Sequence, residues 1–415
     1  MGGAGRGGAL APLRVAGPRG GLPERWPREF RSAVVRAQPP PAPVTPPRPP
    51  SRAERRREQR RARAFGTLTG AGCERKGPRG VQVKLEQLPD FARVYEALRR
   101  GREPPPQGGA GLRRWRQGRR TGGGPLPDAA VLGDAWLGPA VADGLLDPLV
   151  GADEAAWWGH VPPALRRVAR RAPGSGAVSE YGFVWGAPFR WGCACIAYRQ
   201  DRVPPERQSP GAWGWGDLWH PGLAGRVGLA ESARFLGALT LLRMGASANA
   251  EDLSDVGVRA FAAEFAALRA QVRVSSEESA LKALEAGDVW AAALWTGPAL
   301  ASAVARSPKI ALAVPDAGTL LWADLMVSPA RLLGGQPASP LVPLWHEFLL
   351  EPARAEPALG LSRGSASVHL LSSGGRGQGR GGNFLPSEGC LQRSEFLEPL
   401  SEGALEQLRE VVLAL

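Results

Sequence analysis

The sequence predicts an α/β fold in which buried strands alternate with helices. Short apolar runs bounded by turn residues are repeatedly followed by stretches with helical spacing, the pattern of strand–helix units rather than of an all-helical protein. No run approaches the roughly 18 to 20 apolar residues that a membrane-spanning helix needs. With 415 residues, the chain has room for two or three domains of ordinary size.

The net charge of +13 is concentrated at the start of the chain. Residues 1–66 hold 15 Arg and 4 Glu, a local charge of +11, whereas the remainder carries 37 basic and 35 acidic side chains. A second basic stretch, residues 99–124, holds 8 Arg against Glu103. The folded part is therefore nearly neutral, which argues against a nucleic-acid-binding groove.

The N-terminal part of the chain has the composition of a disordered segment. Runs such as "PPPAPVTPPRPP" contain few large apolar residues, so they cannot bury enough surface to fold. We therefore predict a disordered low-complexity transit or linker segment over residues 1–77. Its Arg-rich, acid-poor composition resembles an organelle transit peptide more than a secretory signal. The alternative is a disordered basic tail that stays attached.

The folded elements follow from hydrophobic period and from capping signals. Phe261, Phe265 and Leu268 recur on one face of a helix. Ser275 and Glu278 have capping-box spacing ahead of another helix. The expected elements are, in order, a strand at 81–85, a helix through 91–98, a surface insertion at 101–124, a strand at 129–132, a helix ending near 144, strands at 185–199 and 226–232, helices ending near 245, 272 and 287, strands at 288–295, 310–318 and 318–330, and helices at 340–350 and 402–415.

Catalytic and metal-binding signatures are missing from the sequence. The four histidines stand apart without ligand spacing, and no nucleophile is paired with a base, so we expect neither an enzyme nor a cofactor. Cys193 and Cys195 share a strand face, but without a third ligand nearby they make a weak metal site. Buried free thiols are the favoured interpretation.

One charged residue, Asp324, lies in the middle of the apolar stretch "GTLLWADLMVSPA" at 318–330. Trp322 precedes it by two positions and therefore projects from the same face of a strand. An indole and a carboxylate together suit a cation. The alternative is a structural aspartate that caps a neighbouring loop beside an ordinary core tryptophan.

Tryptophans at or near predicted strand ends are further candidates for a binding site. In open parallel sheets, ligands bind outside the carboxyl ends of the strands. Of the 14 tryptophans in the chain, the four at or near strand ends are Trp136, Trp191, Trp295 and Trp322. Asp134, two residues before Trp136, supplies a second carboxylate.

Seven segments together resemble a known family, the spermidine/putrescine-binding branch of ABC-transporter solute-binding proteins and its plastid-targeted relatives. They cover roughly residues 125–415 in the family's order and spacing, and the third and sixth are the more specific. The segments are "PDAAVLGDAWLGPAVADGLLDPL", "APFRWGCACIAYR", "WGDLWHPGLAGRVGLAESAR", "MGASANAED", "LKALEAGDVWAAALW", "VPDAGTLLWADLMVSPA" and "SEFLEPLSEGALEQLREVV".

The resemblance implies an α/β two-lobe, periplasmic-binding-protein-like (type II) fold with hinge strands, beside the disordered N-terminal extension. Residues 78–195 with 323–375 would form lobe 1, and residues 196–322 with 385–415 would form lobe 2. It also implies an ABC-type membrane permease as partner and a plastid (chloroplast) location, either stroma or thylakoid lumen. We expect a monomer that does not bind nucleic acid.

In polyamine binders of this kind, aromatic side chains stack along the methylenes and carboxylates hold the ammonium ends. By motif, Trp322 and Asp324 match the family's Trp-x-Asp, and Trp295 matches the tryptophan that ends the preceding strand. The first-lobe aromatic turn maps near Asp134 and Trp136. The resemblance thus implies a small cationic ligand, a polyamine such as putrescine or spermidine.

One departure from the family concerns the second ligand anchor. Phe235 stands where the family has a glutamate, and Glu231 lies nearby but on the strand side. Losing one anchoring carboxylate is expected to cost ~2 to 5 kcal/mol of binding free energy, because an ammonium would be desolvated without a partner. The competing interpretation is therefore a protein-interaction or regulatory module that kept the fold and lost its ligand.

Overall fold

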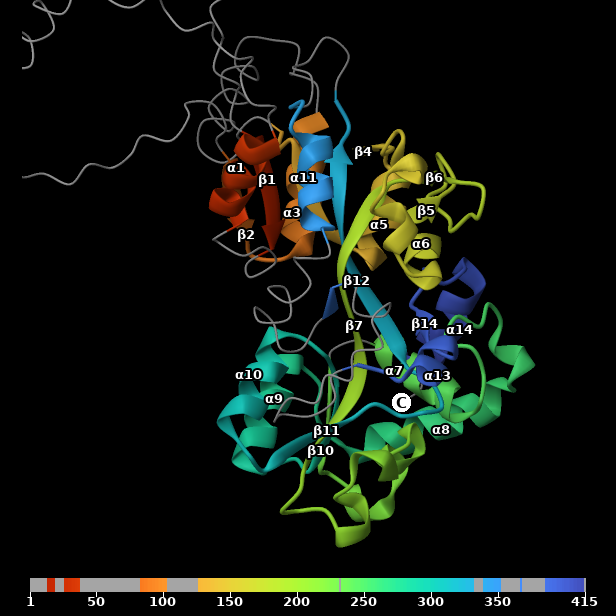
Figure 1. Cartoon of the computed structure of the whole chain (residues 1–415). Coiled ribbons are helices and arrows are strands. Elements are labelled where there is room, and N and C mark those ends of the chain that lie inside the picture. The colour runs from red at the N-terminus through yellow and green to blue at the C-terminus, as the bar shows by residue number, and fades with distance from the viewer. Residues whose placement is uncertain are drawn as a thin grey trace, which may run out of the picture.

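The chain forms two α/β lobes that are joined by two long strands, β7 (Gly186–Arg199) and β12 (Leu320–Pro329) (Figure 1). The two strands pair antiparallel, with Trp322 opposite Gly192 and Asp324 opposite Arg190. A computed structural model describes residues 13–18, 26–37, 83–102, 126–230, 233–331, 339–351, 366–367 and 385–413.

Lobe 1 is built on a sheet with the strand order β2-β1-β3-β12-β7. β1 pairs parallel with both β2 and β3, whereas β12 runs antiparallel to β3. Each residue of β3 is buried, as expected for a strand covered on both faces. The elements of this lobe besides β7 and β12 are β1 (Leu13–Pro18), α1 (Trp26–Ala37), β2 (Val83–Leu88), α3 (Phe91–Arg102), β3 (Ala129–Gly133), α5 (Asp134–Ala142), β4 (Leu146–Asp147), α6 (Pro163–Ala169), β5 (Arg170–Arg171), β6 (Phe183–Val184), α11 (Val342–Leu349) and β13 (Ala366–Ser367).

Lobe 2 continues from the far half of β7, which pairs antiparallel with β10 and β11. β8 lies parallel to both β10 and β9. Helices cover this sheet in the lower part of Figure 1. The elements are β8 (Val227–Leu229), α7 (Ala233–Arg243), α8 (Val258–Gln271), β9 (Val272–Val274), α9 (Glu277–Ala286), β10 (Ala291–Trp295), α10 (Pro298–Arg306), β11 (Ile310–Ala313) and α14 (Glu402–Leu413).

The change from one lobe to the other falls within the two long strands. Cys193 belongs to the apolar core of lobe 1, and the next residue, Ala194, to a core of lobe 2. On β12 the same change lies between Leu320, in the lobe-2 core, and Leu321, in the lobe-1 core. β7 and β12 are therefore the hinge strands, and side chains near these positions lie between the lobes.

A third connection comes from the C-terminal part of the chain, where α13 (Glu388–Gln392) is followed by β14 (Glu395–Phe396). β14 pairs parallel with the start of β12. Phe396 packs against the core of lobe 1, and Leu397 packs against a core of lobe 2. Consecutive residues of an extended chain project in opposite directions, so this short segment touches both lobes.

The prediction of a disordered N-terminal segment is wrong for residues 13–18 and 26–37. β1 lies between β2 and β3 in the sheet, with Leu13 and Val15 buried. Trp26 and Phe30 of α1 enter the lobe-1 core. Sequence composition missed these elements because two short apolar patterns stand among many Arg, Gly and Pro residues. The remainder of residues 1–77 lies outside the described residues.

Other expectations from sequence can also be compared with the structure. The helix before Gly287 is capped by Ser276, whose side chain accepts a hydrogen bond from the Ser279 N–H, one position later than expected. Gly287 has the positive φ of a C-cap. The basic insertion at 101–124 lies outside the described residues, except for the last two residues of α3. Among the described helices, none has the length and apolar character needed to cross a membrane.

Candidate functional site

Asp324 meets a partner within the chain. Its side chain is 2% exposed, and the Arg190 Nε donates a hydrogen bond to Asp324 Oδ2 at 2.8 Å. Arg190 Nη2 donates to the same oxygen and completes an ion pair. Burial raises the pKa of Asp324, and the Arg190 guanidinium opposes this shift. The carboxylate that the sequence suggested for a ligand ammonium is therefore neutralised by a residue on the neighbouring strand.

Trp322 lies against the same guanidinium. The Arg190 guanidinium carbon is 5.6 Å from the centre of the Trp322 ring, within cation–π range. The indole rests on Gly192: a Cβ at that position would be 2.6 Å from Trp322 Nε1 and would also collide with Thr296 Oγ1. Glycine is thus required for Trp322 and the end of β10 to meet here. The buried Trp322 Nε1 has no hydrogen-bond acceptor among the described residues.

Asp134 supplies a second buried carboxyl beside this pair. It is the first residue of α5, directly after the end of β3, and its Oδ1 accepts a hydrogen bond from the Ala323 N–H at 2.9 Å. Burial raises the pKa of Asp134 to about 7. The Ala323 N–H and the Arg171 charge oppose the rise, and the Asp324 charge adds to it. The structure therefore places Asp134 beside the Trp322–Asp324 segment of β12, through its hydrogen bond with the Ala323 N–H.

This raised pKa leads to an expected pH dependence of stability. As pH rises from about 4 to about 7, the native state keeps a proton on Asp134 that the unfolded chain has lost, so this group's contribution to stability falls with rising pH. Asp134→Asn stays neutral and keeps an oxygen for the Ala323 N–H. We expect its free energy of unfolding relative to the wild type to improve on the order of 1 to 3 kcal/mol between pH 5 and 8. Urea unfolding at both pH values measures this difference.

The matched control for this prediction is Glu154→Gln, because Glu154 is an exposed carboxylate. That variant should keep the pH slope of the wild type. If Asp134→Asn also keeps the wild-type slope, the buried carboxyl does not titrate near neutral pH.

In lobe 2, Trp295 lies half-buried at the end of β10. Its ring centre is 5.0 Å from that of Phe235, which is on α7 and almost fully buried. The position at which a second carboxylate was expected is therefore filled by an aromatic contact. Glu231, the nearby carboxylate in the sequence, lies outside the described residues.

Two of the proposed site tryptophans have other contacts. Trp191 is 1% exposed within the lobe-1 core, so it is not accessible to a solute in this structure. Its neighbours on β7, Arg190 and Gly192, project to the opposite face, because side chains alternate along a strand. Trp136 is half-buried against Tyr95 of α3, with ring centres 5.2 Å apart. Burial corrects the assignment of Trp191 to the site, whereas the assignment of the half-buried Trp136 stays a prediction.

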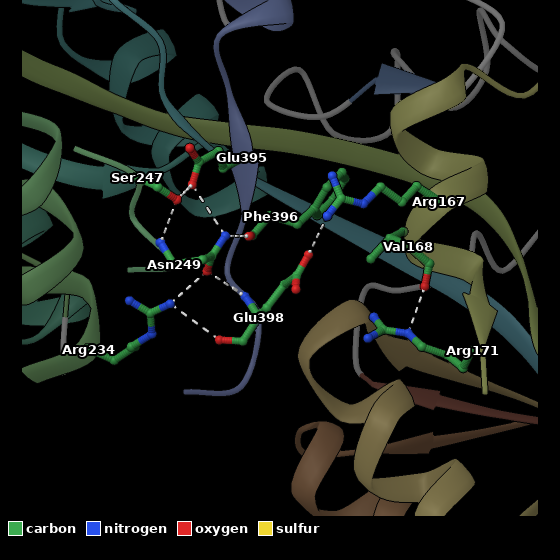
Figure 2. A network of polar contacts seen from close by, with 9 residues as sticks. All are labelled: Arg167, Val168, Arg171, Arg234, Ser247, Asn249, Glu395, Phe396 and Glu398. Atoms are coloured by element: carbon green, nitrogen blue, oxygen red, sulfur yellow. Dashed lines mark hydrogen bonds and ion pairs between the residues drawn. The ribbon is translucent and has the colours of Figure 1, made fainter. Parts of the chain in front are cut away.

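A polar network lies around the C-terminal segment between the lobes (Figure 2). Asn249 Nδ2 donates to the Phe396 carbonyl at 2.8 Å, and the Glu398 N–H donates to Asn249 Oδ1 at 2.9 Å. Arg234 donates to the Glu398 carbonyl at 3.2 Å. From lobe 1, Arg167 reaches the Glu398 carboxylate at 3.3 Å. Most of these bonds therefore fix the segment to lobe 2, and one exposed ion pair ties it to lobe 1.

The described residues contain no group of three or more side chains suited to hold a metal ion. Cys193, Cys195 and Cys390 are buried thiols that form no disulfide among the described residues, in agreement with the expectation of buried thiols for the first two. Burial raises the pKa of the Cys193 and Cys195 thiols, so they stay protonated at neutral pH. Thiolate chemistry is therefore not favoured at these positions.

Two lobes that are joined by hinge strands, with aromatic and charged side chains between them, define a solute-binding protein. The sequence profile of the bacterial extracellular solute-binding protein family matches residues 125–359, more than half of the chain. The chain belongs to that family. Its members are binding proteins rather than enzymes.

Two relatives that are similar in sequence to part of this chain are also solute-binding proteins. The spermidine/putrescine-binding periplasmic protein of Escherichia coli K12 is 27% identical over 168 residues, 40% of this chain and 45% of that protein. The spermidine/putrescine-binding periplasmic protein 1 of Haemophilus influenzae is 27% identical over 128 residues, 31% of this chain and 35% of that protein. The matched segments thus span less than half the length of these curated relatives.

Solved structures show the same fold. The spermidine/putrescine ABC transporter substrate-binding protein PotD from Streptococcus pneumoniae superposes with a TM-score of 0.65 at 14% identity, covering 97% of this chain and 98% of that chain. The Tp0655 (TpPotD) lipoprotein of Treponema pallidum gives a TM-score of 0.60 at 14% identity, covering 97% and 99%. The predicted two-lobe type II fold and the family resemblance are confirmed.

The most important residue that sequence reasoning missed is Arg190. A signal was present, because Arg190 is the one charge in the interior of the apolar strand "GAPFRWGCACIAYR", whose other charge, Arg199, is its last residue, and Asp324 is likewise the one charge within its own strand. Two isolated charges in two buried strands are expected to pair. The register that places them opposite each other could not be read from the sequence.

Proposed function

We propose that this protein is the solute-binding component of an ABC-type transport system and that it binds a small aminated solute of the polyamine type between its lobes. The observation that carries the proposal is the match over 168 residues to spermidine/putrescine-binding periplasmic proteins. An ABC-type membrane permease is the partner that this role requires. The role involves no catalytic step.

The geometry between the lobes supports this proposal. Trp322 on β12 and Trp295 on β10 are both half-buried. Trp322 pairs opposite Gly192 and Trp295 opposite Ala194, two positions apart on β7, so the register places both side chains on one face of that strand. Aromatic faces gain binding energy from contact with the methylenes of a flexible chain, and they attract its ammonium groups. Trp322 contributes from the lobe-1 side of the hinge, and Trp295 contributes from lobe 2.

Calorimetry on the full chain with putrescine and spermidine tests the proposal. We expect saturable binding that weakens about tenfold or more in Trp322→Ala, since loss of an aromatic and cation–π contact costs on the order of 1 to 2 kcal/mol. The matched control is Trp290→Ala, which removes another half-buried indole that has an arginine at 5.2 Å, at the opposite end of β10 from Trp295. Equal loss of binding in both variants would refute a specific role for Trp322.

A second candidate function is favoured by two contacts. The Arg190–Asp324 pair and the Phe235–Trp295 packing occupy positions that a diamine would use, as expected for a fold that has become a protein-interaction or regulatory module. Absence of binding by a well-folded protein, with no response to any polyamine, would support this alternative.

The plastid location stays a prediction. It depends on the Arg-rich composition of the N-terminal part of the chain. The position of β1 in the sheet limits which residues a targeting peptide could remove. A targeting peptide has to leave residues 13–37 on the chain, because β1 and α1 belong to lobe 1. Sequencing the N-terminus of the protein isolated from its source tests this condition.

A further inference from the structure

Each of the two hinge strands carries a largely buried charged residue, and these two residues lie opposite each other in the strand pairing. Asp324 is opposite Arg190 in the register of β12 and β7, and the side chain of Arg190 is only 14% exposed. Such a pair is not needed to hold two strands together, because a well-packed apolar pair of similar volume is often as stable. Its position beside Trp322 at the boundary between the lobes points to a role in binding.

The guanidinium has the environment that a bound ammonium would have. It donates two hydrogen bonds to Asp324 Oδ2 and lies 5.6 Å from the centre of the Trp322 ring. A carboxylate and an aromatic face are the two groups that hold an organic cation most strongly. Both are already in use by a cation that belongs to the chain.

We propose that Arg190 is the specificity-determining residue of the inter-lobe site: its guanidinium holds the ammonium position between Trp322 and Asp324 and weakens the binding of solutes with two ammonium ends. The inference rests on the proposed function, since it concerns the same site. A diammonium solute has to displace Arg190 before one end can reach Asp324. A solute with one ammonium and one oxygen-bearing end avoids this competition.

A further observation agrees with this inference. On the other side of the hinge, Phe235 packs on Trp295 and supplies no negative charge. The described part of the site thus offers little to a second ammonium.

Binding of putrescine and 4-aminobutyrate, which have equal carbon chains, to the full-length protein tests the inference by calorimetry. The measured quantity is the ratio of their affinities. We expect Arg190→Gln to raise this ratio in favour of putrescine about tenfold or more, because Asp324 becomes available to an ammonium. Arg190→Lys is expected to fall between this variant and the wild type, since one ammonium cannot reproduce both guanidinium contacts. If Arg190→Gln does not fold, the affinity ratio of Arg190→Lys still tests the inference.

The matched control is Arg226→Gln, which removes another guanidinium that lies over an indole, that of Trp290, at 5.2 Å. It should leave the ratio unchanged. If the wild type binds no polyamine but Arg190→Gln does, the inference holds and the proposed function fails. If the wild type binds putrescine and neither Arg190 variant changes the ratio, the proposed function holds and the inference is wrong. Absence of binding in wild type and variants alike overturns both.

Discussion

A chain that starts at residue 67 is expected to lack a folded lobe 1. Such a truncation removes β1 from between β2 and β3, and with it the pairing partner of both strands. It also removes Phe30, whose ring packs edge-on against Trp345 at 5.0 Å. Loss of a strand and of two or more core aromatic side chains exceeds the roughly 5 to 15 kcal/mol by which a domain is stable. Thermal unfolding followed by near-ultraviolet circular dichroism measures the outcome.

Point variants separate this effect from the mere shortening of the chain. Val15→Asp buries a charge in β1 and should also unfold lobe 1, whereas Arg14→Gln on the same strand changes a half-exposed residue and should be tolerated. A truncated chain that keeps a native melting transition for both lobes would contradict the place of β1 in the sheet. It would also restore the interpretation of residues 1–66 as a removable peptide.

The second large effect is expected at the pair between the hinge strands. Asp324→Leu removes the carboxylate with which the largely buried Arg190 guanidinium pairs and should cost about 3 to 5 kcal/mol of stability. Arg190→Met should cost a similar amount, because Asp324 then loses its partner. The double variant Arg190→Met with Asp324→Leu removes both charges and is expected to recover most of the loss. Urea unfolding of the four proteins gives the coupling free energy.

A coupling free energy below ~0.5 kcal/mol would mean that the two charges do not stabilise each other. Such a result would return Asp324 to the role suggested by the sequence, a carboxylate reserved for a ligand. The exposed pair between Arg306 and Glu285 provides a reference, because both are at a surface where ion pairs contribute little.

Much of the fold could be predicted from local sequence patterns. β3, β10 and β12 are short apolar runs with clear turn signals, and the structure places the ends of each of them within three residues of expectation. β1 escaped notice because six residues carry too little period to stand out from an Arg- and Pro-rich context. A strand of this kind is stabilised by pairing with its two neighbours in the sheet, and the residues of the strand itself do not indicate that pairing.

The candidate site was harder to predict than the fold. Trp322, Asp324 and Asp134 were recognised, since their residue types and spacing are local features of the sequence. Arg190 was not, because its contact with Asp324 joins residues 134 positions apart and depends on strand register. Residue type alone also does not distinguish a tryptophan that contacts a ligand from one that packs in the core. Only the burial in the structure shows that Trp191 belongs to the core.

The C-terminal segment between the lobes has a consequence for the open form of the protein. Phe396 packs on lobe 1, whereas Asn249 and Arg234 hold the same segment to lobe 2. A rotation that separates the lobes breaks the exposed ion pair of Glu398 first and then uncovers the Phe396 ring. Phe396 is only half-buried in this structure, so opening would enlarge an apolar surface that is already partly exposed rather than create a new one.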